Sequence, residues 1–364
     1  MSEASRLPDD GAPARGTSVP SGAPAPGEDR RPPAPGPSAP EQGPYSPERL
    51  QAVRELLRAD MRRRDELNER ACRALDGVVH ALKPEGLDRS LPDRVLLEYD
   101  LQAEGGPVAV VAVGDPFTAT HVTWMVSGMG IRPETAMWGA VHEAGHLWEA
   151  QREAGAPRPA TVAWLGYRSP NALAALLDGP ARAGARALAD HLVRCADQLR
   201  RTRGGAAPRV HLGLEAHSYG TVVAAHALEL LQRRRTAGED VPALDVLVLS
   251  GAVGLPRRLA RDPGLMGLDA DRVYQASAPQ DLLAGIGRMV GRRLPWEGVR
   301  TLPVAPDPHG EALAGAAVTG HDTSRWTPAH GEDAPRGYRD PGTVTLAAAA
   351  RVTAGLPLAS QRRT

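Results

Sequence analysis

Residues 210–221 read VHLGLEAHSYGT, and the rest of the chain is best understood from this stretch. Its first half alternates apolar residues with polar or small ones, as a strand does, and residues 222–231 follow as a buried helix, VVAAHALELL. Ser218 stands between the two elements, with no room for a loop. This succession predicts a nucleophile elbow, a sharp turn that lifts the serine hydroxyl above a sheet and directs a helix N-terminus at it.

A nucleophile elbow requires small residues two positions before and two positions after the serine, so that strand and helix can approach each other. Here these positions hold Ala216 and Gly220. Glycine is usual at the first position, and Ala216 departs from it by one methyl group. The alternative interpretation is a serine in an ordinary turn between a strand and a helix, and the rest of the chain has to decide between them.

Composition limits the classes of protein to which the chain can belong. Its 364 residues allow one large domain or two small ones, and 43 basic residues balance 43 acidic ones. A net charge of zero gives no broad field for nucleic acid or an anionic membrane. Cys72 and Cys195 both lie in helical patterns, so we expect free thiols. No apolar run reaches membrane-spanning length and no secretion signal is apparent, so we expect a cytoplasmic protein.

Three regions are expected along the chain. Residues 1–45 are rich in Pro, Ala and Gly and cannot bury enough surface to fold, so they should form a disordered tail. Ser46 followed by Pro47 is typical of a helix start, and residues 46–90 should form a helical segment packed on the core. Residues 91–364 should form the catalytic domain.

Strand and helix patterns alternate through residues 91–364. Strands are expected at residues 94–100, 108–113, 121–126, 161–167, 210–217, 245–251, 272–277 and 298–304. Helices are expected at residues 134–153, 170–200, 222–231 and 343–354, the second of them broken at Gly179-Pro180. Residues 105–107, Gly-Gly-Pro, indicate a hairpin between the first two strands. The pattern predicts an α/β fold with one mostly parallel sheet flanked by helices and an antiparallel start.

An activated serine needs a base and an acid that orients the base. Asp281 follows the expected strand 272–277, where a carboxylate at a strand's carboxyl end could hold an imidazole in the correct tautomer. Asp281 could alternatively serve only as the cap of a helix that begins at Leu282. We predict the catalytic role for this aspartate.

Three histidines follow the acid in the chain: His309, His321 and His330. His321 lies in a loop after the last expected strand, from which it could reach Ser218, and it is the predicted base. His309 is the second candidate, and His330 lies deep in a polar loop and fits least.

Two further histidines lie near the serine in sequence, His217 and His226. The first is expected to face away from the turn and the second to lie on a packed helix. We interpret both as structural histidines.

The oxyanion of the reaction needs hydrogen-bond donors. The N–H group of Tyr219, directly after the serine, is one expected donor. The second is expected from the loop 127–130, Ser-Gly-Met-Gly, as the N–H group of Met129. Gly128 and Gly130 would let the backbone approach the substrate, so we predict substrate-binding positions there.

Residues 142–146, HEAGH, form a complete H-E-x-x-H zinc motif on an expected helix, with Glu143 as the potential base. Glu149 stands where the metzincin extension requires glycine. No glutamate occurs between Glu153 and Glu215 to serve as a third ligand of the thermolysin type. We therefore predict no metal site.

The chain from about Val95 to His321 resembles the DUF1023-type α/β-hydrolases of bacteria. The resemblance is carried by four motifs together with Asp281 and Gly320-His321: Val113-Gly114-Asp115-Pro116, the loop 126–130, Trp164-Leu165-Gly166-Tyr167 and His217-Ser218-Tyr219-Gly220. It implies an α/β-hydrolase fold, a triad of Ser218, Asp281 and His321, and no cofactor. Two motifs depart from the family pattern. Residues 127–130 replace Pro-Gly-Thr-Gly, and Ala216-His217-Ser218 replaces Gly-His-Ser, so the substrate preference does not follow from the resemblance.

The sequence thus predicts a serine hydrolase of the esterase and lipase type, acting on a small-molecule ester, amide or thioester. The alternative activity is a zinc peptidase built on residues 142–146. The third interpretation is a hydrolase-fold protein that binds partners and catalyses nothing.

Overall fold

The computed structural model of the chain describes residues 43–83, 91–204, 208–307, 313–331 and 333–358. Within these ranges eight strands form one sheet in the order β1-β2-β4-β3-β5-β6-β7-β8. β2 runs antiparallel to both of its neighbours, and all other adjacent strands are parallel. The strands are β1 (Arg94–Asp100), β2 (Val108–Val113), β3 (His121–Val126), β4 (Pro159–Leu165), β5 (His211–His217), β6 (Val246–Ser250), β7 (Val273–Ala276) and β8 (Arg300–Thr301).

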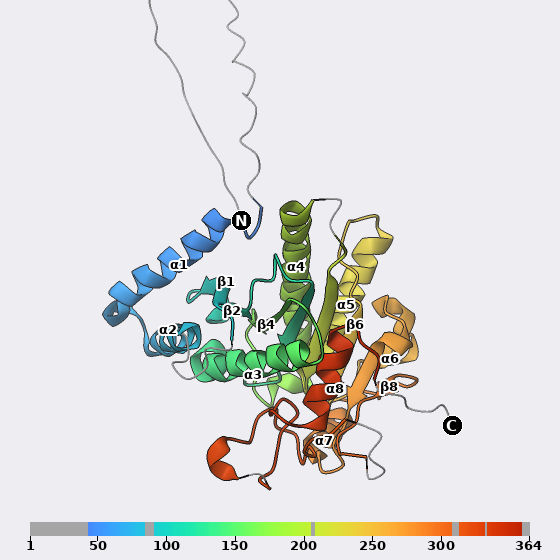
Figure 1. Cartoon of the computed structure of the whole chain (residues 1–364). Helices are drawn as coiled ribbons and strands as arrows, with labels where there is room; N and C mark the ends of the chain where they lie inside the picture. Colours follow the sequence, from blue (N-terminus) through green and yellow to red (C-terminus); the bar gives the residue numbers. More distant parts are fainter. Residues whose placement is uncertain (1–42, 84–90, 205–207, 308–312, 332, 359–364) are drawn as a thin grey trace, which may run out of the picture. The chain divides into compact units, whose positions relative to one another are not determined.

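Helices cover both faces of this sheet (Figure 1). On one face α2 packs on α3 and α3 packs on α8, while α4 and α5 pack against each other on the opposite face. The helices are α1 (Pro47–Arg62), α2 (Glu69–Leu82), α3 (Pro133–Glu153), α4 (Asp178–Arg203), α5 (Gly220–Thr236), α6 (Arg257–Arg261), α7 (Leu282–Val290) and α8 (Val344–Thr353). The predicted α/β class, with a mostly parallel sheet and an antiparallel start, is confirmed.

The two apolar layers follow from the alternation of side chains along each strand. In β3, Trp124 and Val126 face the layer of α4 and α5, whereas Met125 faces the layer of α2 and α3. In β4, Trp164 likewise faces the layer of α4 and α5, and Ala163 faces the layer of α2 and α3. Central strands buried on both faces are therefore almost continuously apolar, which is why they could be predicted from the sequence.

The described part of the N-terminal helical segment, residues 46–83, contains two α-helices, α1 and α2. α1 begins after Ser46, whose hydroxyl accepts a hydrogen bond from the Arg49 N–H group, with Pro47 in the first turn. Asn68 caps α2 by accepting the Ala71 N–H group at 3.0 Å. Of the predicted tail, residues 1–42 lie outside the described residues. The prediction is wrong for its last residue, because Tyr45 is buried in the core with its hydroxyl 2.9 Å from His191 Nδ1.

The predicted helix break at Gly179-Pro180 is wrong. Both residues lie in the first turn of α4, which continues without interruption to Arg203. Proline is tolerated there because the first N–H groups of a helix have no intrahelical acceptor.

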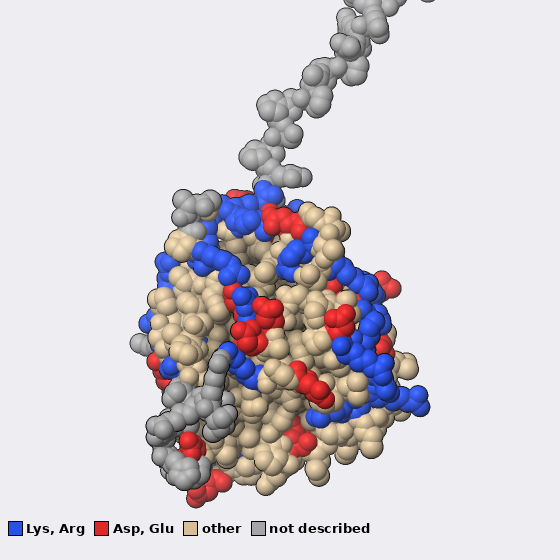
Figure 2. Space-filling view, turned by 90° about the vertical axis from the view of Figure 1, so that its right-hand side faces the viewer, with Lys and Arg blue, Asp and Glu red and all other residues tan. Residues whose placement is uncertain are grey.

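Charged side chains of both signs lie among uncharged ones on the face shown in Figure 2. Ion pairs occur among the charged side chains of the described chain, for example Arg234 with Asp190 at 3.0 Å and with Glu239 at 2.8 Å. Over the described ranges, every helix is too short or too polar to cross a membrane.

Candidate active site

Ser218 lies at the sharp turn between β5 and α5. Its backbone φ angle is +54°, in the left-handed region that residues other than glycine rarely adopt. Its N–H group donates to the carbonyl oxygen of Ser250 at the end of β6, 3.0 Å away, and the side chain is buried. Backbone strain at one residue persists only where its surroundings fix it, and here the neighbouring strand and the following helix do so.

The residues on either side of the turn explain its sequence requirements. A Cβ atom at Gly220 would lie 2.5 Å from the carbonyl oxygen of Val126 and 2.8 Å from that of Ser127. Only glycine fits there, because both obstacles are backbone atoms. Ala216 is fully buried between β3 and β6, and its methyl group is accommodated.

Asp281 follows β7 and is the N-cap of α7. Its Oδ1 accepts the Ala284 N–H group at 2.9 Å, and its Oδ2 accepts the Tyr338 hydroxyl at 2.9 Å. Burial alone would raise the pKa of Asp281, but hydrogen bonds from His321, Ala284 and Tyr338 outweigh burial and lower the pKa. The two roles weighed for Asp281, helix cap and partner of a histidine, are therefore not exclusive.

His321 lies between the serine and the aspartate. Its Nε2 is 2.7 Å from Ser218 Oγ and its Nδ1 is 2.7 Å from Asp281 Oδ1. A carboxylate only accepts hydrogen bonds, so Nδ1 carries the proton and Nε2 can accept from the serine hydroxyl. His330 lies instead in the turn Pro328–His330, near the Thr327 N–H group. His309 lies outside the described residues.

The loop 127–130 follows β3 and lies against Ser218. A Cβ atom at Gly128 would come within 2.9 Å of the Ser218 Cβ, so glycine permits this close approach. The loop is held by the segment after β4, because Ser169 donates to the Gly128 carbonyl at 2.9 Å and Gly130 donates to the Pro170 carbonyl at 3.0 Å.

The N–H groups of Met129 and Tyr219, the expected oxyanion donors, lie in this loop and directly after Ser218. Within the described part of the chain neither donates to a protein acceptor. Neither N–H group is therefore engaged by the described chain.

The expectation that His217 faces away from the turn is wrong. His217 lines the same cavity as Ser218, and its Nε2 lies 2.7 Å from the backbone carbonyl oxygen of His321, to which it donates. Burial, with smaller contributions from Arg339 and His321, lowers the pKa of His217 well below its ordinary value. His226 is buried in α5 with Glu229 at 3.5 Å, as expected of a structural histidine.

The segment 337–340, Gly-Tyr-Arg-Asp, supports the loop that carries His321 and was not predicted from the sequence. Tyr338 bonds Asp281, and the Arg339 guanidinium lies between Glu143 and Glu215. Asp340 is fully buried and accepts hydrogen bonds from Ser324 and from the N–H groups of residues 325, 326 and 337. No pattern in the sequence of this segment indicates these contacts.

The H-E-x-x-H motif lies on α3 but does not form a metal cluster. Its two rings lie 4.3 Å apart between centroids, and the Nδ1 of His146 is 3.2 Å from the Arg339 carbonyl oxygen. Glu143 instead accepts hydrogen bonds from Thr323 at 2.5 Å and Arg339 at 2.7 Å. Among the described residues, no three His, Cys, Asp or Glu side chains are grouped to hold a metal ion.

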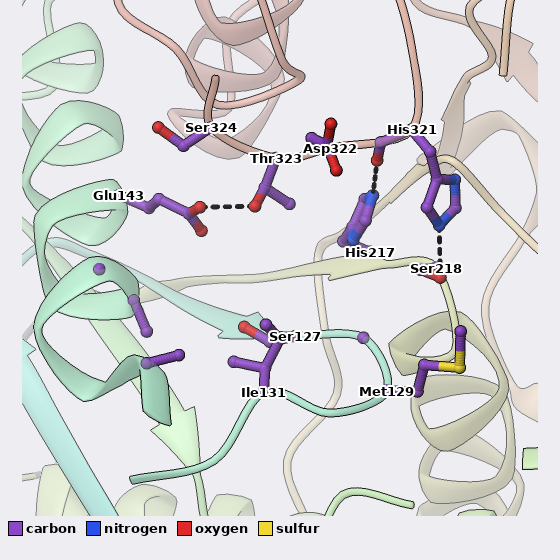
Figure 3. Close-up of a pocket in the computed structure, with 14 residues that line it drawn as sticks. Ser127, Met129, Ile131, Glu143, His217, Ser218, His321, Asp322, Thr323 and Ser324 are labelled. Atoms are coloured by element: carbon purple, nitrogen blue, oxygen red, sulfur yellow. Dashed lines mark hydrogen bonds between the residues drawn. The ribbon is translucent and has the colours of Figure 1, made fainter. Parts of the chain in front are cut away.

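A cavity of about 320 Å³ opens beside Ser218 (Figure 3). One wall is formed by the loop 127–130, Ile131 and small residues of α3, and the other by residues 321–324 with Glu143. The arrangement combines a serine paired with an imidazole, two free N–H groups and an adjoining cavity. It can chemically support nucleophilic attack on a carbonyl carbon.

A family model described as alpha/beta hydrolase matches residues 103–290, slightly more than half of the chain. The matched segment includes Ser218 and Asp281, and His321 lies beyond its end. The sequence has no match among the curated proteins.

Solved structures with a similar fold include several esterases. An arylesterase has 13% identity and a TM-score of 0.37, covering 71% of this chain and 88% of its own. An esterase from the archaeon Pyrobaculum calidifontis has 17% identity and a TM-score of 0.33, covering 71% and 87%. A feruloyl esterase module from Clostridium thermocellum, complexed with sinapinate, has 12% identity and a TM-score of 0.38, covering 59% and 77%. At these values the likenesses carry no information on activity.

Proposed function

The chain belongs to the alpha/beta-hydrolase family, and on this premise we propose that it is a serine hydrolase that cleaves a small-molecule ester, amide or thioester. The observation that supports this proposal is the pair of 2.7 Å contacts of His321, one to Ser218 Oγ and one to Asp281 Oδ1. Such a chain of hydroxyl, imidazole and carboxylate activates a serine that is otherwise a weak nucleophile.

In the proposed mechanism, Ser218 Oγ attacks the carbonyl carbon of the substrate while His321 Nε2 takes the hydroxyl proton. Asp281 stabilises the resulting imidazolium, and its lowered pKa keeps it ionised for that task. The imidazolium then protonates the leaving group, which departs and leaves an acyl group on Ser218. Water, deprotonated by His321, releases the acid and regenerates the serine.

The negative oxygen of each tetrahedral intermediate would bind the N–H groups of Met129 and Tyr219. Tyr219 precedes the first turn of α5, so the positive end of that helix dipole adds to the stabilisation. Removal of one such donor costs on the order of a hundredfold to a thousandfold in turnover in serine hydrolases. Gly128 and Gly130 would let the substrate carbonyl reach these donors.

We further propose that the chain is a DUF1023-type member of this family, with residues 91–364 as its catalytic domain. The motifs quoted from the sequence support this assignment. In the structure, Gly166 of the Trp-Leu-Gly-Tyr motif lies against the Trp164 ring, and Trp164 stacks on Tyr167 at 5.6 Å between centroids. The motif thus packs the segment that leads to Ser169 and Pro170.

Labelling with a fluorophosphonate, followed by peptide mapping, tests the nucleophile. We expect the label on Ser218 and its complete loss in Ser218→Ala. Ser277→Ala removes an exposed serine outside the cavity and should leave labelling unchanged. If the folded parent protein stays unlabelled at high probe concentration, the chain is a hydrolase-fold binding protein and the proposal is wrong.

A further inference from the structure

The cavity beside Ser218 has one acidic end, and this feature bears on substrate choice. Asp322 and Glu143 both line the cavity, together with the hydroxyl groups of Thr323 and Ser324. In Figure 3 the Glu143 carboxylate points toward Thr323, and Glu143 and Ser218 lie on opposite sides of the view. Among the described lining residues, no lysine or arginine is present, and the basic side chains are His217 and His321.

The charges behind this wall do not balance. Arg339 is almost fully buried and forms ion pairs with both Glu143 and Glu215. One guanidinium between two carboxylates leaves one negative charge. Asp322 adds little to this imbalance, because it pairs with Arg325 at 3.2 Å and water screens both exposed side chains.

Glu143 retains capacity to bind a ligand. It is only 8% exposed, and each of its carboxylate oxygens accepts one hydrogen bond, from Thr323 and from Arg339. An ionised carboxylate offers about four acceptor sites, so roughly two remain. Burying a cation next to a largely buried carboxylate is favourable, whereas a second anion there would be repelled in a medium of low dielectric constant.

The apolar wall of the cavity complements this acidic end. Ile131, Ala136 and Ala140 face the same space, and Gly139 leaves room because a Cβ there would meet nothing of the described chain within 4 Å. A ligand with a short apolar body and a cationic end would satisfy both walls. A volume of about 320 Å³ is at the small end for ligand pockets.

We propose that the enzyme prefers small esters or thioesters that carry a cationic group distal to the scissile carbonyl, and that Glu143 is the main determinant of this preference. This inference rests on the proposed serine hydrolase function. It gives the glutamate of the H-E-x-x-H motif a role that involves no metal.

The test compares isosteric substrates that differ only in charge. One pair consists of p-nitrophenyl butanoates ending in a trimethylammonium or a tert-butyl group, and the other of acetylthiocholine and its tert-butyl isostere. We expect kcat/KM to be roughly tenfold higher for the cationic member of at least one pair, which corresponds to about 1.4 kcal/mol. The preference should shrink as ionic strength rises.

Glu143→Gln keeps the size of the side chain and one acceptor oxygen for Arg339, while its NH2 group can donate to the Thr323 hydroxyl, and it should reduce the charge preference to about threefold or less. Arg339 then retains Glu215 as a balanced partner, so the fold should survive. Asp322→Asn, at an exposed side chain, should reduce the preference by about twofold without a folding risk. Glu229→Gln removes a buried carboxylate of α5 that pairs with Arg233 and Arg258 and does not line the cavity, and it should leave the preference unchanged.

Several outcomes overturn the inference. Ratios within twofold of unity for both pairs, or a preference that persists in Glu143→Gln, would contradict it while Ser218-dependent hydrolysis still supports the proposed function. If no probe is hydrolysed, the proposed function fails, and calorimetric binding of the same pairs to Ser218→Ala protein still decides the charge preference. Equal affinity for the two members of each pair would then reject it.

Discussion

Residues 211–236 and residues 319–340 both contribute to the candidate site, but they are built in different ways. The first segment is a strand, a turn and a helix in immediate succession, and its backbone geometry places Ser218. The second contains little regular structure in its described residues, 319–331 and 333–340, and polar contacts to His217 and Glu143 hold the loop that carries His321. The nucleophile is thus positioned by local sequence, whereas the base is positioned by the tertiary structure.

This difference has an energetic consequence. The Ser218 turn is fixed by backbone packing, where the obstacles at Gly220 are carbonyl oxygens that cannot move independently. The His321 loop is held by individual hydrogen bonds, each with a net contribution of about 1 kcal/mol. Substitutions near the serine should therefore affect folding, and those around the histidine loop should mainly affect activity.

The largest effect is expected for the base itself. His321→Ala should lower turnover by on the order of a thousandfold or more, because the members of a triad act as a unit. The free energy of unfolding should change little, since His321 is at the surface of the cavity and its backbone contacts remain. Steady-state kinetics on the purified variant, with chemical denaturation alongside, measures both quantities.

The double variant sharpens this result. His321→Ala added to Ser218→Ala should cost almost nothing further, as expected of residues that act together. Additive losses in the double variant would mean that the two side chains contribute independently, and the triad would have to be abandoned.

The second prediction concerns the serine turn. Gly220→Ala should lower the free energy of unfolding by roughly 3 kcal/mol, the upper range for an added methyl group in a packed site. Gly285→Ala on α7 is the matched control, because a Cβ there would meet no heavy atom of the described chain within 4 Å. It should raise stability by about 0.5–1 kcal/mol through its helix propensity. Urea denaturation that finds Gly220→Ala as stable as the parent would disprove the steric argument.

The same difference between the two segments explains how far the sequence could be read. Three local signals predicted β5, the turn and α5. They are the periodic spacing of apolar residues, the glycine at position 220 and the place of Ser218 between a strand pattern and a helix pattern. Asp281 could be placed because it follows a strand closely. The orientation of His217 could not be predicted, since it depends on the backbone carbonyl group of His321, 104 residues away in sequence.

The segment 337–340 was missed for a related reason. Tyr338, Arg339 and Asp340 carry no periodic pattern, and their partners lie between 3 and 196 residues away in sequence. A buried polar network has no signature in a single sequence, because each member is recognisable only when its partner is known. Local motifs therefore located the nucleophile, and only the fold revealed what supports the base.

The third prediction tests that support. Tyr338→Phe removes the hydroxyl that donates to Asp281 Oδ2 and accepts the Ala278 N–H group at 2.8 Å. Asp281 loses a donor, its pKa rises, and its hold on His321 weakens. We expect kcat to fall by about tenfold with KM nearly unchanged.

Tyr274→Phe is the control for this variant, because among the described residues that hydroxyl forms only a long 3.4 Å contact with Arg300, and Tyr274, on β7, does not line the cavity. It should change kcat by less than twofold. A Tyr338→Phe variant that raises KM and leaves kcat intact would show that this tyrosine acts on the substrate rather than on Asp281.

The smallest effect is expected from the protonation of His217. Burial lowers its pKa well below 6.5, so the folded chain keeps the imidazole neutral while the unfolded chain takes up a proton as the pH falls through 6.5. The unfolded state then binds more protons, and stability is lost below that pH at a rate of up to about 1.4 kcal/mol per pH unit. Above pH 6.5 this histidine makes no pH-dependent contribution.

The variant His217→Gln isolates this effect, because its amide can donate to the His321 carbonyl but cannot titrate. The difference in unfolding free energy between parent and variant should therefore be constant from pH 8 to 7. Between about pH 6.5 and 5.5 the parent should lose stability relative to the variant. Other buried histidines titrate equally in both proteins and cancel in this difference. A pH-independent difference would show that His217 titrates with the same pKa in the folded and the unfolded chain, and would contradict the lowered pKa.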